Sequence, residues 1–305
     1  MYLSIRKTFG FTQFSFTVFL LCTSIFAQSG DDEIISVDSS IVVMNAAVTD
    51  AAGVAVRGLA IKNFRVFEDG AEQEIKSFES EDSPFAAVIL LDTSGSMEER
   101  VTLARAAAIQ FLGGLRPGDT AAIYNFDSKV EMVQDFSESR DVRESIFDLK
   151  SYGWTVLNDA VFKAAELLSK RPEKRRAIIV LSDGADTKSG KSADKALRAA
   201  LLADATVYTV DMAAIDIGGR DRMQNQGVLK NFAEKTGGKF VATPGGVAMR
   251  DAFKRIAEEL GVQYTIAYQP ANTKKDGKWR TIELRVSRPS LTIRTRKGYN
   301  APKSR

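Results

Sequence analysis

Oxygen-bearing side chains follow two strongly apolar runs of this chain and occupy one loop between them. Asp92, Ser94 and Ser96 come directly after the apolar run 86–91, and Asp183 comes shortly after the apolar run 177–181. Thr155 precedes a segment with helical spacing of its apolar residues. Because the carboxyl ends of parallel strands meet at one edge of a sheet, we expect these five side chains to converge there.

Carboxylates and hydroxyls without nitrogen or sulfur ligands suit a hard divalent cation. Mg²⁺ is the first expectation, because it favours octahedral oxygen coordination, and Mn²⁺ or Ca²⁺ are the alternatives. Only two of the five side chains carry charge, so a bound ion would stay electrophilic and accept one more anionic oxygen. A carboxylate from another protein is a natural sixth ligand. The pattern therefore predicts metal-dependent protein binding without a catalytic group.

The composition excludes several other kinds of site. The 305 residues include no histidine and one cysteine. Ser-His-Asp and Cys-His nucleophile pairs, histidine-based zinc sites and an intramolecular disulfide are therefore excluded. The net charge of +3 is too small to indicate a nucleic-acid or acidic-membrane surface. The glycine pairs 237–238 and 245–246 lack GxGxxG spacing, so we predict no nucleotide site.

The first residues have the layout of a secretory signal peptide. Arg6 and Lys7 form a short basic region, and the following mostly apolar stretch ends at Ala27 before polar residues. A buried core segment and an uncleaved membrane anchor are the alternatives. The fully apolar part is shorter than the roughly 20 residues that a spanning helix needs, which favours cleavage over an anchor. Cleavage near Ala27 would also remove Cys22, and a mature chain without thiols suits export.

Residues 83–262 alternate between apolar strands and helices. The runs 86–91, 119–126, 176–181 and 205–210 indicate strands, and 101–112, 142–149, 156–168, 192–203, 226–235 and 247–260 indicate helices. A further short strand is expected at 238–241. This alternation predicts an α/β fold, a doubly wound and mostly parallel sheet with helices on both faces.

Short β segments flank this region. Residues 28–82 contain strand patterns and an Asp69-Gly70 hairpin turn, for which we expect 74–78 to be the return strand. Residues 263–305 alternate again and predict antiparallel strands. The two segments are expected to pack on each other, because termini often lie close together. Within the second, Arg294, Arg296 and Lys297 form a basic strand face, which we interpret as edge protection rather than a nucleic-acid patch.

The motif Asp92-Thr-Ser94-Gly-Ser96 resembles the DxSxS motif of von Willebrand factor type A domains, which are also called integrin I-like domains. By this resemblance Asp92, Ser94 and Ser96 are the first three ligands of a metal-ion-dependent adhesion site. Thr155 matches the loop threonine and Asp183 the second aspartate of the family. The resemblance covers roughly residues 84–262. The flanks, with Phe64–Gly70 and the ending Lys297-Gly298-Tyr299, are similar to a bacterial exported subfamily.

Each of these residues also has a simpler interpretation. Ser96 is suited to cap a helix, Thr155 to precede a helix cap at Asn158, and Asp183-Gly184 to form only a turn. Asp127 and Asp211 also follow apolar strands, either as supporting groups of the site or as ordinary strand-end acids. Tyr152 and Trp154 flank Thr155, where they either line a binding face or pack in the core.

Three functions remain as hypotheses. The first is an exported (periplasmic, cell-surface or secreted) module whose cation accepts an acidic residue of a partner protein, without a stable membrane span after signal cleavage. The second is a Mg²⁺-dependent hydrolase such as a phosphatase, although Asp92 is followed by Thr93-Ser94 rather than by a second acid. The third is a structural envelope component in which the metal only stabilises the loops.

Overall fold

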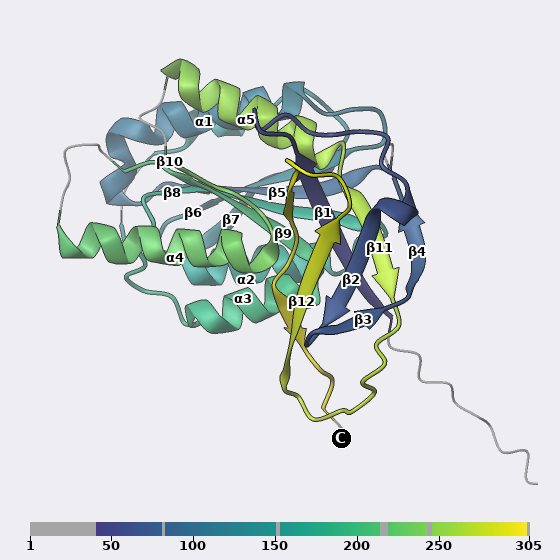
Figure 1. Cartoon of the computed structure of the whole chain (residues 1–305). Coiled ribbons are helices and arrows are strands. Elements are labelled where there is room, and N and C mark those ends of the chain that lie inside the picture. Colours follow the sequence, from purple (N-terminus) through teal and green to yellow (C-terminus); the bar gives the residue numbers. More distant parts are fainter. Residues whose placement is uncertain (1–40, 81–82, 151–152, 214–218, 243–245, 304–305) are drawn as a thin grey trace, which may run out of the picture. The chain divides into compact units, whose positions relative to one another are not determined.

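A computed structural model describes residues 41–80, 83–150, 153–213, 219–242 and 246–303 of the chain (Figure 1). The predicted signal peptide, residues 1–27, lies outside the described residues, as does Tyr152. None of the helices in these described ranges is long and apolar enough to cross a membrane.

The central sheet has six strands in the order β10-β9-β8-β5-β6-β7. All neighbouring pairs are parallel except β6 and β7, which pair antiparallel. The strands are β5 (Phe85–Asp92), β6 (Thr120–Phe126), β7 (Val130–Ser137), β8 (Arg175–Ser182), β9 (Ala205–Asp211) and β10 (Phe240–Ala242). The predicted mostly parallel α/β sheet is thus confirmed. We call this sheet and its helices the α/β part.

Helices cover both faces of the central sheet. Since alternate residues of a strand point to opposite faces, each central strand packs against helices on both sides. In β5, Phe85 and Ile89 pack with α1 and α5, whereas Val88 and Leu90 pack with α2 and α3 on the other face. Figure 1 shows α1 and α5 on one side of the sheet and α2, α3 and α4 on the other. The helices are α1 (Val101–Gly113), α2 (Leu157–Leu168), α3 (Ala193–Leu202), α4 (Arg220–Thr236) and α5 (Gly246–Leu260), with short 3-10 turns η1 (Ile61–Asn63), η2 (Gly95–Arg100) and η3 (Glu144–Asp148).

The flanking segments build two small antiparallel sheets, with orders β13-β1-β11-β4 and β14-β12-β2-β3. Each sheet mixes strands from before and after the α/β part. Their inner faces share one apolar cluster, which includes Met44 and Ile266 from the first sheet and Val66 and Leu284 from the second. The strands are β1 (Val42–Thr49), β2 (Phe64–Glu68), β3 (Ala71–Gln73), β4 (Ile75–Glu79), β11 (Tyr264–Tyr268), β12 (Trp279–Val286), β13 (Thr292–Arg294) and β14 (Gly298–Asn300).

We call this pair of sheets the β sandwich, and it confirms that the two flanking segments pack on each other. The domain boundaries at 82/83 and 262/263 stay predictions, because strand pairing identifies which strands are neighbours but does not locate a domain boundary.

Several elements differ from the sequence predictions. The Asp69-Gly70 turn forms with both residues at positive φ, but its return strand is β3 rather than 74–78. The chain then crosses to the other sheet, where Phe78 of β4 stacks on Tyr264 of β11. The predicted helix at 142–149 is only the 3-10 turn η3, and α4 begins six residues earlier than predicted, at Arg220 instead of Gln226. Strands β7 and β14 were not predicted.

Basic side chains connect the α/β part to the β sandwich. Arg294 pairs with Glu259 of α5, and Arg296 pairs with Asp204 at 2.8 Å. The interpretation of these two arginines as edge protection is therefore wrong, since both point inward to carboxylates. Arg175, which is fully buried at the start of β8, donates to Thr265 Oγ1 of β11 at 3.4 Å.

Candidate metal centre

The loop after β5 carries the first three predicted ligands. Asp92 is the last residue of β5 and is fully buried, Ser94 is buried, and Ser96 is exposed. The Ser94 amide donates to Asp92 Oδ1 at 2.9 Å, and the hydroxyls of Ser94 and Ser96 lie 3.2 Å apart. Ser96 lies inside η2 and α1 begins only at Val101, so its interpretation as a helix cap is wrong. The end of β5 and the loop after it thus hold three potential oxygen ligands close together.

The loop before α2 contacts the first loop directly. The amide of Gly95 donates to the Gly153 carbonyl at 3.4 Å. Gly153 has φ +84°, and a Cβ there would lie 2.6 Å from Ser128 Oγ, so glycine is required at this close approach. Trp154 donates its amide to the same hydroxyl at 3.2 Å, while its side chain is 58% exposed. The core-packing alternative for Trp154 is therefore wrong.

Thr155 is buried between this loop and the loop after β8. Its amide donates to Thr187 Oγ1 at 2.9 Å, and its carbonyl accepts from the amides of Thr187 and Lys188 at 3.0 Å each. Helix α2 begins at Leu157, so the predicted cap at Asn158 is wrong. The capping acceptor for the Asn158 amide is instead Asp186 Oδ2, at 2.8 Å.

The loop after β8 carries the second carboxylate of the predicted set. Asp183 is half-buried and accepts from the Ala185 amide at 3.0 Å, so it does form a turn with Gly184. The preceding residue, Ser182, donates its hydroxyl to Asp92 Oδ2 at 2.5 Å and accepts from the Gly184 amide at 3.0 Å. Sequence reasoning missed this role, although in-register pairing of Leu91 with Leu181 places the next residues side by side.

The electrostatic environment of Asp92 lacks a basic partner. Burial raises the pKa of Asp92 to about 7, and the nearby Asp183 carboxylate pushes the pKa in the same direction. Hydrogen bonds from Ser182 and Ser94 favour the ionised form and oppose this rise. Within the described part of the chain, no lysine or arginine contributes to the shift. A bound cation would supply the missing positive charge.

Two other strand-end acids have local partners. Asp211 is buried and pairs with Arg222 at 3.1 Å and with Gln226 at 2.7 Å. Asp127 accepts from the Lys129 amide at 3.1 Å. Both contacts are those of ordinary strand-end acids.

The donor set fits a hard cation, but it does not form an acidic cluster. Among the described residues there is no group of three or more His, Cys, Asp or Glu side chains that would hold a metal by itself. The predicted set has two carboxylates and three hydroxyls, so coordination by Asp92, Ser94, Ser96, Thr155 and Asp183 stays a prediction.

The order of these elements agrees with a family match. The model of the family described as "von Willebrand factor type A domain" matches residues 87–185. This range begins in β5 and ends after β8. The chain contains a von Willebrand factor type A domain. No curated protein sequence matches the chain.

Solved structures with von Willebrand factor type A domains or related folds resemble this one at low identity. A D319A mutant of the PilB minor pilin from Streptococcus sanguinis has a TM-score of 0.48 and 13% identity, over 59% of this chain and 62% of that chain. BatB from Bacteroides thetaiotaomicron has a TM-score of 0.46 and 20% identity, over 58% of this chain and 98% of the BatB chain. A von Willebrand factor type A protein from Catenulispora acidiphila has a TM-score of 0.48 and 15% identity, over 88% of this chain and 75% of that chain.

This chain thus spans less than two thirds of the length of the pilin.

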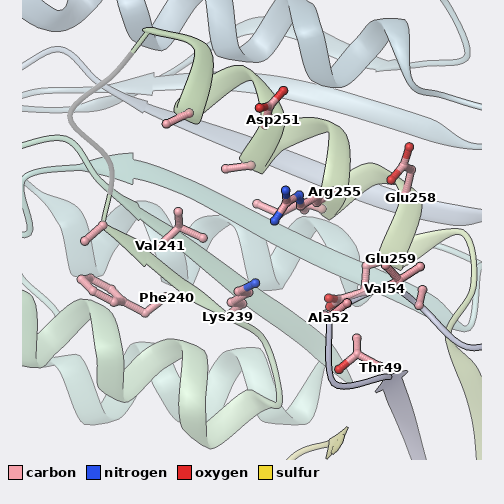
Figure 2. A pocket seen from close by; sticks show the side chains of 16 residues that line it. Thr49, Ala52, Val54, Lys239, Phe240, Val241, Asp251, Arg255, Glu258 and Glu259 are labelled. Atoms are coloured by element: carbon pink, nitrogen blue, oxygen red, sulfur yellow. The ribbon is translucent and has the colours of Figure 1, made fainter. Parts of the chain in front are cut away.

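A separate groove of about 600 Å³ lies away from the predicted ligands, between β10, α5 and the turn after β1. Figure 2 shows Lys239 and Arg255 together with Asp251 and Glu258 around it. Because both signs of charge line this groove, it does not select an anion or a cation.

Proposed function

We propose that the chain is an exported protein-binding module, in which the von Willebrand factor type A domain captures an acidic side chain of a partner through a divalent cation. Asp92, Ser94, Ser96, Thr155 and Asp183 would hold the cation, with Mg²⁺ as first choice and Mn²⁺ or Ca²⁺ as alternatives. When bound, the cation would supply an electrophilic position for the partner's carboxylate. The observation that carries this proposal is the buried Asp92 carboxylate beside Asp183, without a basic partner among the described residues.

The roles of the chain's own residues follow from their contacts. Ser182 and the Ser94 amide fix the two oxygens of Asp92, so the carboxylate needs little reordering on binding. The bond between Gly95 and Gly153 holds the Thr155 loop against the first loop. Trp154 is exposed next to Thr155 and offers the partner an aromatic surface beside the cation. We propose no catalytic residue, because the set is suited to hold a ligand rather than to transfer protons.

Metal binding is the first test. Mn²⁺ or Mg²⁺ titrated by calorimetry into residues 28–305 is expected to bind once, and Asp92→Asn or Asp183→Asn to weaken binding roughly tenfold or more. Asp127→Asn is the matched control, since Asp127 is also a strand-end acid but accepts, from the described residues, a turn amide alone. Absence of binding, or equal affinities in all variants, would contradict the proposal.

Partner capture is the second test and separates the alternatives. Proteins retained from the native envelope by the wild type in Mg²⁺, but neither in chelator nor by Asp92→Asn, are the expected partners. Chelation that lowers only the melting temperature would favour the structural hypothesis. Robust turnover of phosphoesters that Asp92→Asn abolishes would favour the hydrolase.

A further inference from the structure

A second groove, of about 590 Å³, lies where the start of β1, the end of α3 and the residues after β14 meet. The β9 strand begins nearby at Ala205, whereas the predicted metal ligands follow the carboxyl ends of β5 and β8. Because these strands are parallel, the groove and the metal centre lie at opposite ends of the central sheet. A ligand of this groove would therefore not compete with one at the metal centre.

Large apolar side chains are exposed along this groove. Leu202, the last residue of α3, is 80% exposed, and Ile41 is 56% exposed. Pro302 and the half-buried Tyr299 add to the apolar lining. Exposed apolar side chains gathered in one concave surface are typical of a binding site.

The β1 strand offers an open edge to this groove. β13 pairs with Ala47–Thr49 only, and Thr295 donates its hydroxyl to the Asn45 carbonyl at 2.9 Å on the same side of β1. Because the backbone groups of alternate residues face the same edge, those of Val43 and Ile41 face this side too. No strand among the described residues pairs with them there. An added segment would continue the line of β13.

Among the described residues that line the groove, the unpaired charges have one sign. The single acid among them, Asp204, pairs with Arg296 at 2.8 Å. Arg198 and Lys303 also line it, are exposed, and form no ion pair with any described residue. This distinguishes the groove from the one in Figure 2, where acids and bases are mixed. The charge is complementary to carboxylates.

We propose that this groove binds an extended, acidic and apolar segment of another protein. The segment adds a short strand along Ile41 and Val43, packs its apolar side chains on Ile41 and Leu202, and directs carboxylates to Arg198 and Lys303. Main-chain hydrogen bonds hold the strand, and the basic rim selects the sign of its side chains. The protein would then engage two partners, one at each end of the central sheet.

The test uses synthetic peptides and the protein in excess chelator, so that the metal centre takes no part. Capped peptides of about eight alternating valine and glutamate residues are titrated against a matched peptide with lysine in place of glutamate. The glutamate peptide is expected to bind at least about tenfold more tightly, and added salt to weaken it. Amide shifts in NMR spectra should change at Ile41, Val43 and Leu202.

Two variants locate the binding. Leu202→Glu is expected to weaken the glutamate peptide at least about tenfold, whereas Met223→Glu, at a residue 77% exposed on α4, is the matched control and should not. Val43→Pro removes an N–H that faces the open edge and should also weaken binding.

Three outcomes with the peptides would overturn the proposal. They are no binding of the glutamate peptide, equal binding of both peptides, or binding unchanged in Leu202→Glu. Laurate, a fatty-acid anion that is both apolar and negatively charged, is titrated in the same way. Binding of laurate without binding of the glutamate peptide would also overturn the proposal and would assign the groove to an anionic amphiphile.

Discussion

At the scale of single residues, Ser182 determines how the Asp92 carboxylate lies. Its hydroxyl donates to Asp92 Oδ2 and at the same time accepts from the Gly184 amide, so it joins the end of β5 to the loop after β8. Both Asp92 and Ser182 are fully buried, and water cannot replace either bond. The contact is therefore structural as well as a means of orienting a predicted ligand.

Ser182→Ala is expected to destabilise the metal-free protein by about 1–3 kcal/mol, because it leaves a buried carboxyl oxygen and a buried amide without partners. Urea unfolding in chelator measures this. The control is Ser169→Ala, whose hydroxyl bonds the Glu166 carbonyl at an exposed helix end and should matter much less. An unchanged midpoint in Ser182→Ala would contradict the role assigned to the hydroxyl.

The strand-end positions of Asp92 and Asp183 could be predicted from sequence, because each follows an unbroken apolar run. The bond from Ser182 could not, because it depends on the register between two strands 90 residues apart. The support of Thr155 by Thr187 also depends on how a loop folds back, for which no local pattern exists.

At the scale of elements, Gly184 sets the path from β8 to its loop. It has φ +84°, and a Cβ there would lie 2.5 Å from the Asn225 carbonyl oxygen of α4. Gly227, also in α4, has no neighbour within 4 Å of an added Cβ. The glycine that approaches α4 and the glycine within α4 thus differ in whether they can accept a side chain.

Gly184→Ala is expected to lower the free energy of unfolding by about 1–3 kcal/mol, because it combines backbone strain with a collision against backbone. Gly227→Ala should instead raise it by about 0.5–1 kcal/mol, since alanine favours the helix interior. Chemical denaturation of both variants gives the comparison. Equal effects would show that the close approach at Gly184 relaxes without cost.

Three tyrosines, the buried Tyr208 and Tyr268 and the half-buried Tyr299, connect elements through hydrogen bonds to carboxylates. Tyr268 and Tyr299 donate to Glu68 at 2.7 and 3.0 Å in the β sandwich, and Tyr208 donates to Glu259 at 2.7 Å. Burial raises the pKa of each phenol above its ordinary value, and the carboxylate that accepts its bond raises it further. The folded protein therefore holds these protons more tightly than the unfolded chain does.

Stability from these phenols is expected to be fully present below the unfolded tyrosine pKa of about 10 and to be lost as the pH rises above it. Phenolate absorbance followed together with circular dichroism measures this. Among the seven tyrosines, Tyr208, Tyr268 and Tyr299 should ionise only as the fold is lost. Complete ionisation with a native dichroism spectrum would contradict the prediction.

The elements of the α/β part could be predicted because long apolar runs and helical periods are local signals. The β sandwich was predicted only as flanking strands that pack together. Its pairing scheme depends on partners from opposite ends of the chain, such as Met44 with Ile266 and Val66 with Leu284. Edge strand β7 was missed because its exposed residues, among them Met132, interrupt the apolar pattern.

At the scale of the whole described chain, the α/β part is inserted between strands that complete one sandwich. Because β11 pairs with both β1 and β4, residues on either side of the insertion depend on each other. The ion pair of Arg294 with Glu259 adds a side-chain link between the two parts, and Arg294 also donates to the Gly238 carbonyl at 2.9 Å. Unfolding of one part should therefore weaken the other.

A double-mutant cycle on Arg294→Met and Glu259→Gln is expected to give a coupling of about 0.5–3 kcal/mol, because both side chains are largely buried between the two parts. The control cycle is Arg65 with Glu72, an exposed pair within the β sandwich at 2.6 Å, which water screens and which should couple clearly less. Thermal unfolding followed by tryptophan fluorescence and circular dichroism gives the energies. A coupling no larger than that of the control pair would mean that strand pairing alone connects the α/β part to the sandwich.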